Sequence, residues 1–168
     1  EFRYRHPVVD SSCLVVAITQ SGETADTLAA VKEAQKHGAP VLGICNVVGS
    51  TITRVCRNMI MTLAGPEVSV ASTKTFTTQI VALYLLAVKL GIGRGALPQE
   101  RIGELLRDLL EIPTQMEDLL HQAGDVYLAM ARRFSHSTNM LYLGRGLNFP
   151  IALEGALKLK ELSYIHAE

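Results

Sequence analysis

The chain has 168 residues, enough for one medium domain or for parts of two. Hydrophobic residues make up 48% of it and aromatic residues only 5%, so we expect a core of aliphatic side chains. Lysine plus arginine balances aspartate plus glutamate at 16 each, which leaves no overall field that would attract nucleic acid or an anionic membrane.

Three cysteines, Cys13, Cys45 and Cys56, are odd in number and lack the spacing of metal ligands. They are interpreted as free thiols, which predicts a reducing, cytoplasmic environment. The first residues contain no apolar segment of the signal-peptide kind. The most apolar stretch, residues 80–88, is too short to cross a bilayer and predicts a helix buried in a core or at a subunit interface.

Predicted strands and helices alternate along the first part of the chain, after a polar connection over residues 1–10. Apolar runs predict buried strands, and amphipathic runs between them predict helices. This order is typical of a parallel sheet with right-handed crossovers. The expected strands are residues 13–18, 41–45 and 58–63, and the expected helices are residues 26–37 and 51–57.

Residues 19–24, the 19–24 turn, join the first predicted strand to the first predicted helix. Thr19, Gln20, Ser21 and Thr24 supply hydroxyl or amide groups, and Gly22 lets the backbone approach a ligand closely. With the free N–H groups of the helix start, they form a site suited to one phosphate group. The turn contains no lysine, so it is not a nucleoside-triphosphate loop. An ordinary capped helix start fits the same pattern.

The middle of the chain is predicted to be mainly helical. Residues 64–67 form a loop at the carboxyl end of the third strand, where ligands of open α/β sheets collect. Ser72 is expected to cap a helix over residues 73–90. A further helical stretch begins at Leu97 and is expected to be interrupted by Pro113, and another helix is expected from Gly124. Its adjacent basic residues near position 132 are interpreted as a solvated face.

A second α/β unit is predicted near the end of the chain, with a strand over residues 139–144, a Gly-rich turn and a helix over residues 150–164. The unit is expected to be incomplete. Glu154, Lys158 and Glu161 are spaced by four and three, so they share one face of that helix. The spacing alone favours a surface ladder of ion pairs.

Several stretches resemble the sugar-isomerase (SIS) domain family, beginning with Gln-Ser-Gly-Glu-Thr over residues 20–24. Within that family the match is to the isomerase half of the glutamine–fructose-6-phosphate aminotransferases. One departure is visible, because the family usually has Ser where this chain has Thr19, and the added methyl could narrow the pocket. The matching stretches are residues 1–5, 20–28, 44–46, 70–74, 76–79, 143–146, 150–161 and 163–168.

The resemblance implies an α/β fold of the SIS type, a truncated three-layer sandwich with a parallel sheet and flanking helices. Residues 1–95 would be the C-terminal part of a first SIS subdomain. Residues 96–123 would be a helical connection, and residues 124–168 the start of a second subdomain.

The resemblance also assigns roles to side chains. Glu161 would be the base that moves a proton between C1 and C2 of the sugar, and Lys158 would assist it. The phosphate would be held by Thr19, Gln20, Ser21 and Thr24, and the sugar site would be lined by Val70 and Ser72. No metal or organic cofactor is implied.

The implied substrates are fructose 6-phosphate and glutamine-derived ammonia, and the product is glucosamine 6-phosphate. The implied partners are a glutaminase domain of the same parent chain and a second copy in a homodimer, without nucleic acid or membrane. The resemblance places a first phosphate turn, a ring-opening His and a Schiff-base Lys outside these residues. We therefore expect no activity from these residues alone, and a structural role for His166.

Two other functions fit the phosphate turn. One is another SIS isomerase or a deglycase for a different aminated sugar phosphate. The other is a non-catalytic sugar-phosphate sensor that regulates transcription, against which the pair Lys158 and Glu161 argues. The flanking sequence would separate them: an N-terminal glutaminase domain favours the aminotransferase, and a helix-turn-helix domain favours the sensor.

Overall fold

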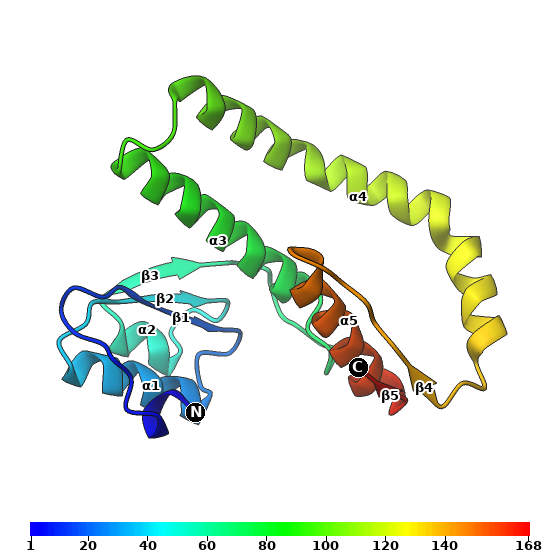
Figure 1. Ribbon diagram of the computed structural model, residues 1–168, viewed down its shortest axis with the longest axis horizontal. Helices are drawn as coiled ribbons and strands as arrows, with labels where there is room; N and C mark the ends of the chain where they lie inside the picture. The colour runs from blue at the N-terminus through cyan, green and yellow to red at the C-terminus, as the bar shows by residue number, and fades with distance from the viewer. The chain divides into compact units, whose positions relative to one another are not determined.

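The computed structural model describes residues 1–168, which divide into two compact units, residues 1–87 and 88–168. The first unit begins with the short 3-10 helix η1 (Phe2–Tyr4) and contains a parallel sheet of strand order β1-β2-β3 (Figure 1). Its strands are β1 (Val15–Thr19), β2 (Val41–Cys45) and β3 (Asn58–Met61). The helices α1 (Ala25–Lys36) and α2 (Thr51–Val55) connect them.

The core of this unit lies between the sheet and the two helices. Figure 1 shows α1 and α2 on the same side of the sheet, as consecutive right-handed crossovers in one direction require. The strands pair in register from Val15 opposite Val41 to Thr19 opposite Cys45. As the sequence predicts, the core is aliphatic. Its buried members are Ala17, Val31, Ala34, Ala39, Val41, Cys45, Ile52 and Cys56.

The prediction of strands and helices is confirmed for this unit, with small shifts at the ends. The middle strand has the predicted bounds, whereas β1 begins two residues later than predicted and includes Thr19. All three cysteines are free, as predicted. Cys13 is partly exposed and precedes β1, while burial raises the pKa of the Cys56 thiol and makes it less reactive.

Helix α3 (Lys74–Gly93) is longer than the predicted helix and extends past residue 87 into the second unit. The helix has the length and the mean hydropathy, 1.6, of a membrane-spanning helix. Core helices of soluble proteins can have the same length and hydropathy. Only 11% of its most apolar window is buried. The prediction of a helix buried in a core is therefore wrong for this chain by itself, and a subunit interface stays a prediction.

Helix α4 (Gln99–Phe134) is continuous, so the predicted interruption at Pro113 and the new helix at Gly124 are wrong. Proline removes one backbone donor and crowds the preceding turn. The helix continues through it because most residues on both sides, such as Glu111 and Met116, are good helix formers. The predicted subdomain boundaries after residues 95 and 123 stay predictions.

The second unit ends in a strand–helix–strand motif made of β4 (Asn139–Met140), α5 (Asn148–Ser163) and β5 (His166–Ala167). The two strands pair in parallel, and the His166 N–H donates to the Thr138 carbonyl at 3.3 Å. The predicted strand over residues 139–144 is therefore shorter, and the α/β unit expected to be incomplete has a second strand. Two residues are too few to produce a periodic pattern in the sequence.

Candidate functional site

The 19–24 turn lies at the carboxyl end of β1 and leads directly into α1. Its backbone is held by its own hydroxyls: the Gly22 N–H donates to Thr19 Oγ1 and the Glu23 N–H to Ser21 Oγ, each at 3.2 Å. Thr24 is the N-cap of α1, but its side chain makes no capping hydrogen bond. The first N–H groups of α1 also lack intrahelical acceptors. The turn therefore presents exposed donors to an anion.

Gly22 fits the turn because it has no side chain. Its φ of +71° lies in the left-handed region, which other residues rarely adopt. A Cβ at this position would lie 2.7 Å from the Ser50 Cβ and 2.8 Å from the Ile52 Cγ2. The turn is thus packed against the loop that follows β2.

Hydrogen bonds fix the turn to the start of α2, which follows that loop. The Ile52 N–H donates to the Gly22 carbonyl at 3.1 Å. The Glu23 carboxylate accepts bonds from both the backbone N–H and the hydroxyl of Thr51, each at 2.7 Å. These bonds from Thr51 lower the pKa of Glu23, so its carboxylate is ionised at neutral pH. Because Thr51 binds this charge, the carboxylate does not occupy the N–H groups of α1.

Asn46 connects the carboxyl ends of the three strands and was not singled out as a functional residue by sequence reasoning. Its backbone N–H donates to the Gln20 carbonyl at 3.2 Å, and its Nδ2 donates to the Gly65 carbonyl at 2.8 Å. Its Oδ1 accepts bonds from the Ala64 N–H at 2.7 Å and the Thr62 hydroxyl at 3.1 Å. The available signal was a polar residue directly after a buried strand.

We expect Asn46→Ala to lower the free energy of unfolding by about 2–4 kcal/mol, because three side-chain hydrogen bonds are lost from a buried position. Asn58→Ala is the matched control, since Asn58 is exposed at the start of β3 and should change stability by less than about 0.5 kcal/mol. Denaturant unfolding measures both. Equal stability of the two variants would contradict the role given to Asn46.

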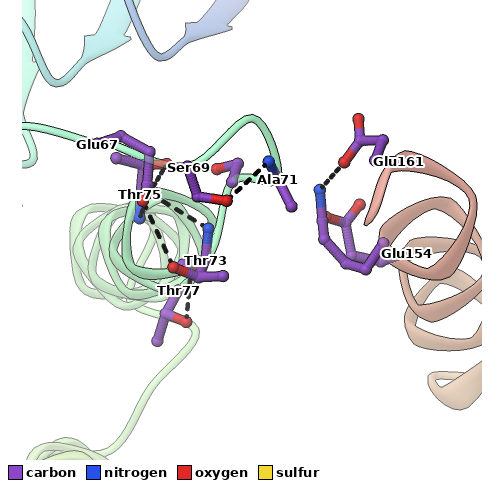
Figure 2. Close-up of polar contacts among 10 residues, drawn as sticks. Glu67, Ser69, Ala71, Thr73, Thr75, Thr77, Glu154 and Glu161 are labelled. Carbon is purple, nitrogen blue, oxygen red and sulfur yellow. Dashed lines mark hydrogen bonds and ion pairs between the residues drawn. The ribbon is translucent and has the colours of Figure 1, made fainter. Parts of the chain in front are cut away.

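The loop between β3 and α3 contains the two residues predicted to line the sugar site. Val70 is 86% exposed, and Ser72 is partly buried. The Ser72 hydroxyl hydrogen-bonds the hydroxyl of Thr75, which is fully buried in the first turn of α3. Figure 2 shows this loop and the Glu67 side chain beside the start of α3. One predicted sugar-binding side chain is therefore anchored, and the other is open to solvent.

Helix α5 carries the three charged side chains that share a face. Lys158 Nζ lies 3.1 Å from Glu154 Oε1 and 2.9 Å from Glu161 Oε2. The ladder of ion pairs that the spacing predicted is present, and its side chains are partly buried, with 22–30% of each exposed. The two glutamates are labelled in Figure 2.

The charges of Glu154, Lys158 and Glu161 affect one another. Partial burial works to lower the pKa of Lys158, but the hydrogen bonds and charges of Glu161 and Glu154 outweigh it and raise the pKa above its ordinary value. Lys158 is therefore an ammonium at neutral pH and can stabilise negative charge. Because an ammonium has no free electron pair, a proton acceptor on this face of α5 must be one of the two carboxylates.

The structure brings the predicted residues together in groups. The four phosphate-site candidates share the 19–24 turn, and Val70 and Ser72 share a second loop of the same unit. Lys158 and Glu161 share α5 in the other unit. His166 lies in β5, with its ring 3.6 Å from the Glu168 carboxylate. The roles of the site residues stay predictions.

Comparison with known proteins gives matches along the whole chain. It is 56% identical over 168 residues to a glutamine–fructose-6-phosphate aminotransferase (isomerizing) of Chlorobaculum tepidum, and 53% identical to that of Methanosarcina acetivorans. In both cases it spans 27% of the relative's length. The C-terminal domain structure of glucosamine–fructose-6-phosphate aminotransferase from Francisella tularensis aligns with a TM-score of 0.94 at 42% identity, covering 99% of this chain and 47% of that one.

A protein-family model matches the first part of the chain. The SIS domain model matches residues 1–89, which include the parallel sheet, the 19–24 turn and most of α3. The α/β fold with parallel strands and flanking helices agrees with this match. The resemblance read from Gln-Ser-Gly-Glu-Thr is thereby confirmed, and the chain belongs to the SIS domain family.

Proposed function

We propose that the chain is part of the sugar-phosphate isomerase domain of a glutamine–fructose-6-phosphate aminotransferase. The observation that carries the proposal is the match over the full chain to relatives of that name, at 45–56% identity. The parent reaction converts fructose 6-phosphate and glutamine-derived ammonia into glucosamine 6-phosphate.

In this function the 19–24 turn binds the phosphate group of the sugar. Hydroxyls of Ser21 and Thr24 and the free N–H groups of α1 are the donors, and Thr19 and Gln20 complete the set. The arrangement suits a phosphomonoester because hydrogen bonds to a charged acceptor are stronger than those between neutral groups. Val70 and Ser72 line the sugar part of the site.

The chemical step is a proton transfer between adjacent carbons. Glu161 takes the proton from C1, the C–H electron pair forms a C1–C2 double bond, and the electrons of the C2 double bond move onto its heteroatom. The same carboxyl then returns the proton to C2, where the electron pair of the C1–C2 double bond accepts it, and the base is restored. The oxygen of the C1 hydroxyl forms the new C1=O double bond as its proton passes to the heteroatom on C2. Lys158, held as an ammonium by Glu154 and Glu161, stabilises the negative charge that develops between these steps.

The proposal extends to partners and location. A glutaminase domain of the same parent chain supplies ammonia, and two copies form a homodimer in the cytoplasm. The free thiols support a reducing compartment, and the exposed apolar side chains of α3 suit a subunit interface.

Isothermal titration calorimetry with fructose 6-phosphate tests the binding role in the full-length gene product. Ser21→Ala and Thr24→Ala should each weaken binding by about 1.5–3 kcal/mol, because each removes a hydrogen bond to a charged group. Thr24→Ser is the matched control, since it keeps the hydroxyl and should retain parent affinity. Unchanged affinity in both alanine variants would contradict the phosphate assignment.

A further inference from the structure

The Glu67 carboxylate closes the loop that contains Val70 and Ser72. Its Oε2 accepts bonds from the Thr75 hydroxyl at 2.9 Å, the Thr73 N–H at 3.2 Å and the Thr75 N–H at 3.3 Å. Figure 2 shows these bonds reaching from Glu67 to the start of α3. One side chain therefore joins the two ends of the loop.

Further hydrogen bonds lie inside the loop. Ala71 is fully buried, and its N–H donates to Ser69 Oγ at 3.2 Å. The hydroxyl of Thr75 contacts both the Glu67 carboxylate and the Ser72 hydroxyl. A change at Glu67 would therefore reach Ser72 through a single shared partner.

Glu67 also occupies the N-terminus of α3. A free helix N-terminus attracts anions, and here the Glu67 carboxylate already accepts the N–H of Thr75 in the first turn and that of Thr73 just before the helix. Partial burial raises the pKa of Glu67, but the bonds from Thr75 and Thr73 outweigh it and lower the pKa, so the carboxylate is ionised at neutral pH. By contrast, Thr24 makes no side-chain capping bond at α1. The start of α1 therefore lacks a side-chain cap, whereas Glu67 caps the start of α3.

We propose that Glu67 is a positioning residue, which fixes the loop of Val70 and Ser72 for the sugar and closes the α3 N-terminus to the phosphate. The inference rests on the proposed function. It predicts that Glu67 controls affinity for the sugar part of the ligand and leaves the phosphate subsite of the 19–24 turn unchanged.

The test compares fructose 6-phosphate with inorganic phosphate as ligands of the full-length gene product, by calorimetry. In Glu67→Gln the dissociation constant for fructose 6-phosphate should rise roughly 10- to 100-fold, as expected when bonds to a charged group are weakened. The constant for inorganic phosphate should stay within about twofold of the parent value, because the α1 site is intact. A general loss of structure would raise both constants together and overturn the inference.

Thr75→Val supplies a second variant in case Glu67→Gln folds poorly, since it removes the shared hydroxyl and keeps the shape. Like Glu67→Gln, it should weaken the binding of fructose 6-phosphate. The variant that carries both substitutions should lose less binding free energy than the sum of the two single losses. Thr75→Ser is the control with parent affinity. If the ratio of the dissociation constants for fructose 6-phosphate and inorganic phosphate stays at the parent value in both Glu67→Gln and Thr75→Val, this inference alone is overturned. A parent protein that binds neither ligand would overturn the proposed function as well.

Discussion

Replacing Glu161 by glutamine in the full-length gene product should lower turnover roughly 10²–10⁴-fold, the usual contribution of a positioned acid–base group. The amide keeps the size of the side chain and can still accept a bond from Lys158 Nζ, now 2.9 Å from the carboxylate. It cannot accept a proton from carbon. Affinity for fructose 6-phosphate should change little, because the proposed phosphate donors lie on the 19–24 turn and a base acts mainly in the chemical step.

Two measurements separate this role from a structural one. Exchange of the C1 hydrogen of the bound sugar with solvent should fall in parallel with turnover. Glu154→Gln is the matched control, because Glu154 contacts the same Lys158 at 3.1 Å and is similarly exposed, yet should slow exchange less than tenfold. A Glu161→Gln variant with the parent exchange rate would exclude Glu161 as the base and make Glu154 the next candidate. If the protein were a non-catalytic sugar-phosphate sensor, the C1 hydrogen would not exchange with solvent even in the parent.

The parallel sheet could be predicted because its strands are buried and appear in the sequence as continuous apolar runs. The run over residues 41–45 is bounded by Pro40 and Asn46, and the observed β2 has the same limits. Where the signal was weak or ambiguous, prediction failed. β5 has two residues and depends on pairing with β4, which lies more than twenty positions away. In α4, Pro113 predicted a break that neighbouring helix formers overcome.

In the candidate site too, some features could be predicted from the sequence and others could not. The 19–24 turn was found because its hydroxyls, glycine and helix start are contiguous in the sequence. The residues that hold the turn and the neighbouring loops in place are far apart in the sequence. Glu23 bonds with Thr51, and Asn46 bonds with both Gln20 and Gly65. Side-chain bonds of this kind follow no fixed spacing, so a single sequence indicates a contiguous candidate turn better than it indicates the distant groups that orient the turn.

Gly22→Ala should damage the proposed phosphate site more than any single hydroxyl substitution. An alanine at a φ of +71° costs about 1–2 kcal/mol in the backbone alone. The new Cβ would also lie 2.7 Å from the Ser50 Cβ, and such overpacking costs about 1–3 kcal/mol more. The turn must move to relieve this contact, which displaces several donors at once. We therefore expect fructose 6-phosphate affinity to fall roughly 10²-fold or more, since each bond to a charged group contributes about 1.5–3 kcal/mol.

Gly49→Ala is the control that separates backbone strain from the steric contact. Gly49 has a similar φ of +77°, and a Cβ there would meet nothing within 4 Å. It should lose about 1–2 kcal/mol of unfolding free energy and keep parent affinity for the ligand. Denaturant unfolding and calorimetric titration of both variants in the full-length gene product provide the comparison. If Gly22→Ala loses no more stability than Gly49→Ala and binds fructose 6-phosphate as the parent does, the close packing of the turn against Ser50 is not what shapes the phosphate site.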